Sequence, residues 1–139
     1  MRVNPIFGFL GSGKTTLVRR ILAERAATEP TAVIVNEFGD VGIDGDIIGG
    51  EAVDIMQLTS GCLCCTLKGS LILALEELGR NTETVRTVIE ATGIAQPGEL
   101  ADTFADAALA GGIDLGPFIT VVDAPKFSML RHGLGPFYE

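Results

Sequence analysis

A glycine-rich loop that ends in lysine and threonine constrains the fold of this chain more than any other feature. Residues Gly8–Thr15 read GFLGSGKT and fit the pattern G-x-x-x-x-G-K-[ST]. A short β-rich run, Val3–Phe7, precedes the loop, and Lys14–Ala27 follows it with the apolar spacing of a helix. Because a phosphate-binding loop requires a strand before it and a helix after it, this context favours a functional loop over a chance glycine turn.

Each residue type in the loop suits the binding of a triphosphate. The glycines let the backbone curl so that successive N–H groups point at an anion, and the following helix directs its positive dipole end to the same place. Lys14 is expected to reach the β- and γ-phosphates, the Thr15 hydroxyl to ligate Mg²⁺, and the Thr16 hydroxyl to contact the α-phosphate. The predicted phosphate-binding residues are Gly8, Gly11, Ser12, Gly13, Lys14, Thr15 and Thr16.

The rest of the chain alternates β-rich and helical runs. Five expected strands, separated by helices or long loops, predict an α/β fold with a mostly parallel, doubly wound sheet. Pro5 predicts an irregular or partly unpaired start of the first strand. Ile72 and Leu73 predict a second helix that is buried on more than one side. The expected strands are Val3–Phe7, Thr31–Asn36, Val53–Leu58, Val85–Glu90 and Phe118–Val122, and the expected helices are Lys14–Ala27, Leu67–Leu78, one that starts at Pro97 and one from Asp123 to near Arg131.

Length and charge exclude several classes of protein. The 139 residues suit one domain with a substantial core, and no apolar run approaches the length of a membrane span. The net charge of −8 argues against wide contact with nucleic acid and is compatible with metal cations. The first residues lead straight into the loop, so we expect no secretory signal there and place the protein in the cytoplasm.

The three cysteines are clustered within four residues, in the sequence GCLCC at 61–65. Cys62, Cys64 and Cys65 would supply three thiolates, one ligand short of a closed tetrahedral zinc site. An open position suits a metal that is passed on, and the helix that follows favours the thiolate form. Inert core cysteines and a redox switch are the alternatives. An odd, clustered set is a poor disulfide framework, which favours a reducing compartment.

Two acidic residues follow expected strands at their carboxyl ends, where open parallel sheets bind ligands. Glu37 follows the second strand and is a candidate metal ligand. Glu90 ends the fourth and precedes a glycine in the sequence EATG, which suits contact with Mg²⁺ and sensing of the γ-phosphate. The alternative for each is a solvated loop carboxylate. Asp123, after the last strand, also suits a helix cap.

Five motifs in a fixed order resemble the CobW family of P-loop GTPases, metallochaperone relatives of the urease and hydrogenase accessory GTPases. They are GFLGSGKTTL from Gly8, NEFGDVGID from Asn36, GCLCC from Gly61, IEATGIAQP from Ile89 and TVVDA from Thr120. The resemblance implies GTP hydrolysis with Mg²⁺ at Thr15 and Glu90, with Lys14 as the third catalytic residue. It also implies Zn²⁺ or Co²⁺ held by Cys62, Cys64 and Cys65 for a client metalloprotein, and a switch loop at Asn36–Asp44.

One element of the family's pattern is missing from these residues. The sequence contains no N-K-x-D, the element that reads guanine in the family, and no counterpart of the family's C-terminal domain. We therefore expect residues 1–139 to be the N-terminal portion of a GTPase domain, truncated at the C-terminal edge of its sheet. Two other functions stay open at this stage: a metal-binding module without turnover, and a P-loop ATPase or small-molecule kinase.

Overall fold

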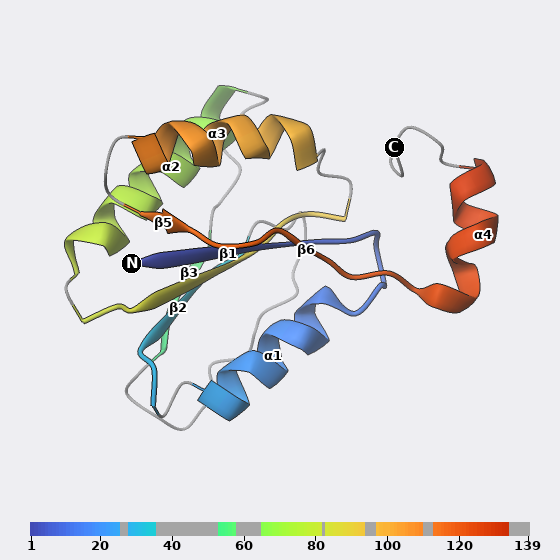
Figure 1. Ribbon diagram of the computed structural model, residues 1–139, viewed down its shortest axis with the longest axis horizontal. Coiled ribbons are helices and arrows are strands. Elements are labelled where there is room, and N and C mark those ends of the chain that lie inside the picture. Colours follow the sequence, from blue (N-terminus) through green and yellow to red (C-terminus); the bar gives the residue numbers. More distant parts are fainter. Residues whose placement is uncertain are drawn as a thin grey trace.

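The computed structural model describes residues 1–25, 28–35, 53–57, 65–81, 83–93, 97–109 and 113–133. Within these residues, strands and helices alternate along the chain as the sequence predicts (Figure 1). None of the helices in this part of the chain combines the length and the apolar character needed to span a bilayer. The elements are β1 Arg2–Phe7, α1 Lys14–Arg25, β2 Thr31–Val35, β3 Val53–Gln57, α2 Cys65–Arg80, β4 Arg86–Glu90, α3 Pro97–Leu109, β5 Asp114–Leu115, β6 Ile119–Thr120 and α4 Ala124–Gly133.

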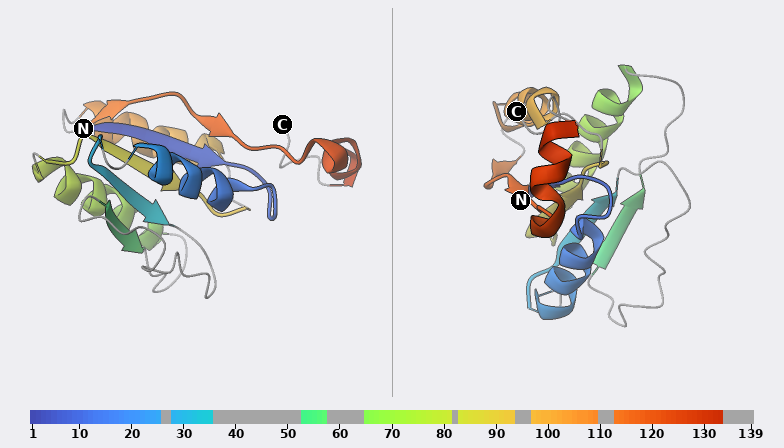
Figure 2. Two further views of the ribbon diagram at one scale, coloured as in Figure 1. Left: turned by 90° about the horizontal axis from the view of Figure 1, so that it is seen from below. Right: turned by 90° about the vertical axis from the view of Figure 1, so that its right-hand side faces the viewer.

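The strands form one sheet in the order β3-β2-β4-β1-β5, and β6 also pairs with β1. Every pairing between them is parallel. Because parallel neighbours need crossover connections, helices cover both faces of the sheet. Helix α1 lies on one face, α2 and α3 lie on the other, and α4 lies beyond the end of β6, away from these layers (Figures 1 and 2). The predicted α/β, parallel, doubly wound fold is confirmed.

Side chains that alternate along each strand build two separate cores, because successive residues of a strand point to opposite faces. The core beneath α2 and α3 includes Val3, Phe7, Ile89 and Phe104. The core beneath α1 contains Ile6, Val18, Leu22, Val33, Val35 and Val88. One prediction about α2 is wrong. Its Leu73 is 66% exposed, so the helix buries a single stripe and not several sides.

The last edge of the sheet differs from the expected single strand Phe118–Val122. Two short strands, β5 and β6, pair with the two ends of β1, and the break between them lies opposite Asn4 and Pro5. The carbonyls of Val3 and Phe7 accept hydrogen bonds from this edge, so the odd-numbered residues of β1 direct their backbone groups towards it. Pro5 has no N–H to offer there, which accounts for the break. The prediction of an irregular or partly unpaired start of this strand is wrong, because Arg2 and Val3 pair with both β4 and β5; the break lies further on, at Asn4 and Pro5, and only on the side of β5 and β6.

Candidate nucleotide-binding site

The loop between β1 and α1 has the backbone of an anion cradle. Gly8, Gly11 and Gly13 have φ values of 145°, 73° and 102°, a region that side chains other than glycine rarely adopt. The amide of Ser12 donates to the carbonyl of Phe9 at 3.1 Å, which closes the turn. The loop then enters α1 at Lys14, and the N–H groups in the first turn of a helix have no partner within the helix, which favours an anion there.

The charged and hydroxyl groups of the loop lie where the sequence places them. Lys14 is 6% exposed, and its Nζ donates to the carbonyl of Phe9 at 3.3 Å, so the ammonium group is folded over the loop. The hydroxyl of Ser12 is buried and has no hydrogen-bond partner within the described residues. A buried orphan hydroxyl is uncommon in native proteins and fits a loop that holds a polar ligand. Thr16 is exposed at the start of α1.

Two close approaches hold the loop against neighbouring segments. A Cβ on Gly8 would collide with the carbonyl oxygen of Val121, the residue after β6. On the other side, a Cβ on Gly93 would lie 2.7 Å from both the backbone nitrogen and the Cγ of Leu10. The loop therefore touches the segments that follow β6 and β4. These contacts were not predicted, because sequence patterns do not report how closely two backbones approach.

Thr15 and Glu90 meet although they lie 75 residues apart in the sequence. The Thr15 hydroxyl donates to Glu90 Oε1 at 2.5 Å, and Glu90 is 3% exposed. Glu90 shares the α1 face of β4 with Val88, and α1 places Thr15 on the side that faces the sheet. A hydroxyl and a carboxylate are the oxygen ligands that Mg²⁺ takes in triphosphate sites, so this pair fits the predicted magnesium site.

The strand register brings the strand ends that precede the predicted site segments to a single edge of the sheet. Val35 at the end of β2 is level with Glu90 of β4 and with Gln57 of β3, and Phe7 is level with Thr120. The loop before α1 therefore starts at the same edge at which β2, β3 and β4 end, as open parallel sheets require of a ligand site.

Three of the predicted metal ligands, Glu37, Cys62 and Cys64, lie outside the described residues. Cys65 is the first residue of α2. Within the residues that the structure describes, no group of three or more His, Cys, Asp or Glu side chains is arranged to hold a metal ion. The cysteine site therefore stays a prediction. Asp123 precedes α4 and accepts a hydrogen bond from the amide of Lys126 at 3.4 Å, consistent with a cap. Its salt bridge to the Lys126 amine, at 2.9 Å, lowers its pKa.

Fold and loop geometry together define a P-loop nucleotide-binding domain. A family model for the CobW/HypB/UreG nucleotide-binding domain matches residues 2–134, and the chain belongs to this family.

Among the curated relatives, the zinc chaperone YjiA of Escherichia coli K12 is 46% identical over 107 residues, which are 73% of this chain and 33% of YjiA. The zinc-regulated GTPase metalloprotein activator 1 of Schizosaccharomyces pombe is 43% identical over 129 residues, 87% of this chain and 31% of that protein.

A crystal structure of the Zn(II)-bound YjiA GTPase from E. coli has the same fold, with a TM-score of 0.66 and 32% identity. The match covers 99% of this chain and 45% of that one. The chain spans about a third of the length of the curated relatives it matches.

Proposed function

We propose that this chain is the phosphate-binding part of a GTP-dependent metallochaperone of the cytoplasm. It binds GTP with Mg²⁺, hydrolyses it, and carries Zn²⁺ or a similar transition metal such as Co²⁺ on Cys62, Cys64 and Cys65 to a client metalloprotein. Residues 1–139 are, in this proposal, the N-terminal portion of a longer GTPase domain. The names of the relatives support it, since they include zinc chaperones and a zinc-regulated GTPase.

The observation that carries the proposal is the shared sheet edge of the phosphate loop and the strands that lead into the candidate metal ligands. Glu37 follows the end of β2 by two residues, and Cys62 follows the end of β3 by five. Five residues span at most about 18 Å when fully extended, which limits how far Cys62 can lie from the end of β3. In this proposal, loss of the γ-phosphate changes the segments that follow β2 and β3, and these segments carry the candidate metal ligands.

Four groups of this chain do the phosphate chemistry in the proposal. The loop amides and the Lys14 amine hold the β- and γ-phosphates, and the Thr15 hydroxyl and the Glu90 carboxylate hold Mg²⁺. When bound, Mg²⁺ neutralises charge that develops on the phosphates. Glu37, in the proposed switch loop Asn36–Asp44, is a candidate ligand of the transition metal. Positioning and charge stabilisation drive hydrolysis in this scheme, without a covalent intermediate.

Nucleotide binding and turnover test the enzymatic half of the proposal. In a full-length version, which would carry the element that reads guanine, GTP should bind more tightly than ATP in an equilibrium assay. Lys14→Ala should abolish phosphate release. The reverse order of affinities would favour the ATPase or kinase alternative. Phosphate release that is absent from the wild type, with zinc still bound, would favour the module without turnover.

Zinc stoichiometry tests the metal half separately. Cys64→Ser should lower the zinc bound per chain in equilibrium dialysis, because a hydroxyl is a poor substitute for a thiolate on a soft cation. Unchanged stoichiometry would favour inert core cysteines. The nucleotide assays do not depend on this result, so the two halves can fail independently.

A further inference from the structure

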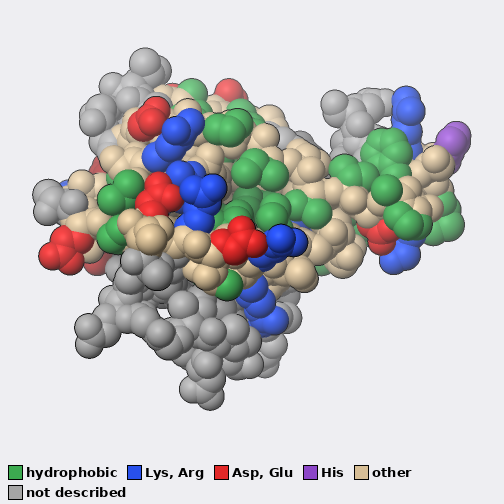
Figure 3. All heavy atoms as spheres, turned by 60° about the horizontal axis from the view of Figure 1, so that its bottom comes forward, with side chains coloured by type: hydrophobic (Ala, Val, Ile, Leu, Met, Phe, Trp, Pro, Cys, Tyr) green, Lys and Arg blue, Asp and Glu red, His purple; other side chains and the backbone are tan. Residues whose placement is uncertain are grey.

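Leu10 is an exposed leucine inside the phosphate loop, and its side chain is 58% exposed. Exposed apolar side chains are common on protein surfaces, and on the face shown in Figure 3 they lie directly beside charged ones. Leu10 differs from such residues in its position, because it stands in a loop that receives phosphates and an apolar side chain cannot bind them. The contacts that Leu10 makes within the protein therefore decide what it does.

Leu10 packs against Gly93, the glycine of the sequence EATG that begins at the end of β4. A Cβ placed on Gly93 would lie 2.7 Å from the Cγ of Leu10 and 2.8 Å from its Cδ2, and also 2.7 Å from its backbone nitrogen. The leucine side chain therefore lies directly on the Cα of the glycine. Gly93 is buried, so the exposed leucine covers it from one side.

The lack of a side chain at residue 93 is explained by this contact and not by the backbone. Gly8, Gly11 and Gly13 have positive φ values, and Gly93 does not. Residues other than glycine can adopt the backbone conformation of Gly93, so it is the space taken by Leu10 that excludes them. The backbone nitrogen of Leu10 is part of that obstacle and cannot swing away as a side chain would. Leu10 and Gly93 therefore form a matched pair.

The backbone N–H of Gly93 has no acceptor among the residues that the structure describes. Buried backbone N–H groups nearly always have a partner in native proteins. Gly93 follows Glu90 by three residues, and Glu90 accepts a hydrogen bond from Thr15 at the proposed magnesium site. A phosphate oxygen at this site is a charged acceptor, which is the kind that binds an N–H most strongly. The γ-phosphate of a bound nucleotide therefore suits the N–H of Gly93.

We propose that Leu10 is a positioning residue that holds Gly93 against the phosphate loop, so that the loop distinguishes a nucleoside triphosphate from a diphosphate. Leu10 acts through Gly93, whose N–H binds the γ-phosphate. A donor that is already in place loses little freedom when the ligand binds, and this raises the affinity. A diphosphate has no γ-phosphate, so its affinity does not depend on Leu10. The inference rests on the proposed nucleotide binding and is independent of zinc and of the choice of base.

Isothermal titration of the chain with a non-hydrolysable GTP analogue and with GDP, both with Mg²⁺, tests the discrimination. Leu10→Ala should weaken binding of the analogue about tenfold, as expected for the loss of one hydrogen bond to a charged group, and should leave the affinity for GDP unchanged. Leu10→Met should keep the wild-type ratio of the two affinities, because it nearly conserves the volume of the side chain. Leu73→Ala, at an exposed leucine of α2, should change neither affinity.

NMR relaxation of the nucleotide-free chain tests the contact without any ligand. The order parameter of the Gly93 amide should be close to the value of about 0.85 that is typical of rigid backbone, and Leu10→Ala should lower it to about 0.6 or less. Leu10→Met and Leu73→Ala should leave it unchanged. Because Leu10 is exposed, Leu10→Ala should still fold, and amides of the central strand β4 should keep their order parameters.

Gly93→Ala provides a second variant at the other side of the contact. It should also weaken binding of the analogue, and the double variant with Leu10→Ala should lose less than the two single losses combined, because both act on one contact. Equal weakening of both nucleotides by Leu10→Ala, an unchanged ratio, or an unchanged order parameter at Gly93 would overturn the proposal. A wild-type chain that binds neither nucleotide would overturn the proposed function and this inference with it, whereas normal binding with an unchanged ratio in Leu10→Ala would overturn the role of Leu10 alone.

Discussion

Substituting alanine for Gly8 places a methyl group where the phosphate loop has no room for one. Gly8 has a φ of 145°, a conformation that is almost restricted to glycine. Its new Cβ would lie 2.6 Å from the Ser12 hydroxyl oxygen and would also collide with the carbonyl oxygen of Val121. The carbonyl belongs to backbone that is itself hydrogen-bonded to Phe7, so it cannot swing away as a flexible side chain would.

The cost has two parts. Holding a residue other than glycine in this conformation costs about 1–3 kcal/mol. Forcing an extra methyl into a closely packed position costs about 1–3 kcal/mol more. The free energy of unfolding should therefore fall by roughly 2–6 kcal/mol, unless the loop moves to relieve the strain. The loop can relieve part of this strain by moving out of the geometry that binds the phosphates. If it relieves about 2 kcal/mol in this way, nucleotide affinity should fall about 30-fold.

Isothermal titration with GTP and chemical denaturation measure the two effects on the same samples. Gly11→Ala is the matched control within the loop: its φ of 73° is also positive, but an added Cβ meets nothing within 4 Å. It should cost about 1–2 kcal/mol from backbone strain alone. Gly69→Ala, in the exposed middle of α2 with open space around it, should leave affinity unchanged and stabilise the fold by about 0.5–1 kcal/mol.

The reasoning is refuted if Gly8→Ala binds GTP as tightly as the wild type, or if Gly11→Ala weakens binding as much as Gly8→Ala does. The first result would mean that the close approach to Val121 is not part of the binding geometry. The second would mean that backbone strain alone, and not the lack of space at Gly8, sets the affinity.

Three further predictions concern the pair at the magnesium site, the core and the ion pair between Arg86 and Glu29. Thr15→Val should abolish the dependence of GTP affinity on Mg²⁺ and destabilise the fold by about 1–3 kcal/mol, because it removes a donor to a buried carboxylate, whereas Thr15→Ser should preserve both properties. Phe104→Ala, at a fully buried side chain, should cost about 3–5 kcal/mol in urea denaturation. Leu73→Ala, on the same face of the sheet but exposed, should change stability by no more than about 0.5 kcal/mol, and a comparable loss would contradict the core described above. The hydrogen bond from Arg86 lowers the pKa of Glu29 below its ordinary value of about 4.5, so this pair stabilises the fold above that pH and the contribution is lost as the pH falls through the lower folded value. Glu29→Gln should therefore destabilise the protein near neutral pH and lose its effect in acid, and a loss that is independent of pH would contradict the ion pair.

Local sequence patterns predicted the phosphate loop and most of the fold. The loop has a defined spacing, and the continuous β-branched run Thr31–Val35 is typical of a strand buried on both faces. The meeting of Thr15 with Glu90 followed from a topological rule. Glu90 ends β4, and Thr15 lies in the first turn of α1, after the loop that leaves β1 at the same edge of the sheet. The pattern of the sequence could place them at that edge but could not supply the distance.

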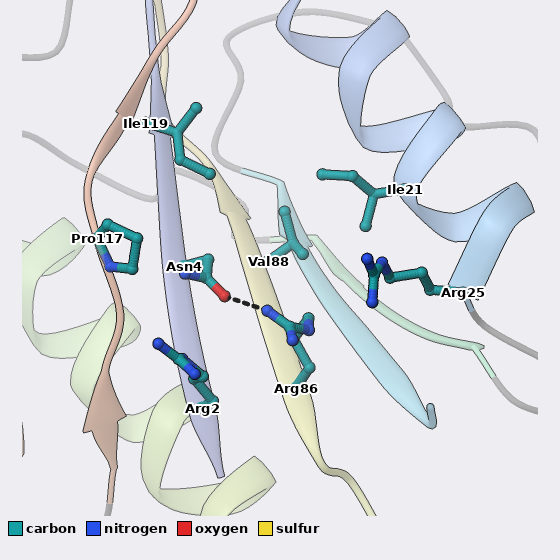
Figure 4. A pocket seen from close by; sticks show the side chains of 8 residues that line it. All are labelled: Arg2, Asn4, Ile21, Arg25, Arg86, Val88, Pro117 and Ile119. Carbon is teal, nitrogen blue, oxygen red and sulfur yellow. Dashed lines mark hydrogen bonds between the residues drawn. The ribbon is translucent and has the colours of Figure 1, made fainter. Parts of the chain in front are cut away.

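The features that escaped prediction depend on contacts between distant segments. Strand β5 has two residues, Asp114 and Leu115, without a β-branched run, and it exists because it pairs with the start of β1. A hollow beside α1 brings together Arg2 of β1, Arg25 of α1 and Arg86 of β4, which are far apart in the sequence (Figure 4). Leu73 was expected to be buried because its side chain is apolar, but its position on α2 leaves it exposed to solvent.

Coupling between nucleotide and metal is the central claim of the proposed function. The most direct measurement is the affinity of the wild-type chain for Zn²⁺, by competition with a chromogenic chelator, in the presence of Mg²⁺ with a non-hydrolysable GTP analogue, with GDP, or without nucleotide. Coupling free energies between sites usually change affinity about 5- to 150-fold, so the GTP analogue should change the zinc affinity by at least about fivefold relative to GDP. Lys14→Ala should remove the difference. Equal zinc affinities in all three states, with the analogue shown to be bound, would contradict the account.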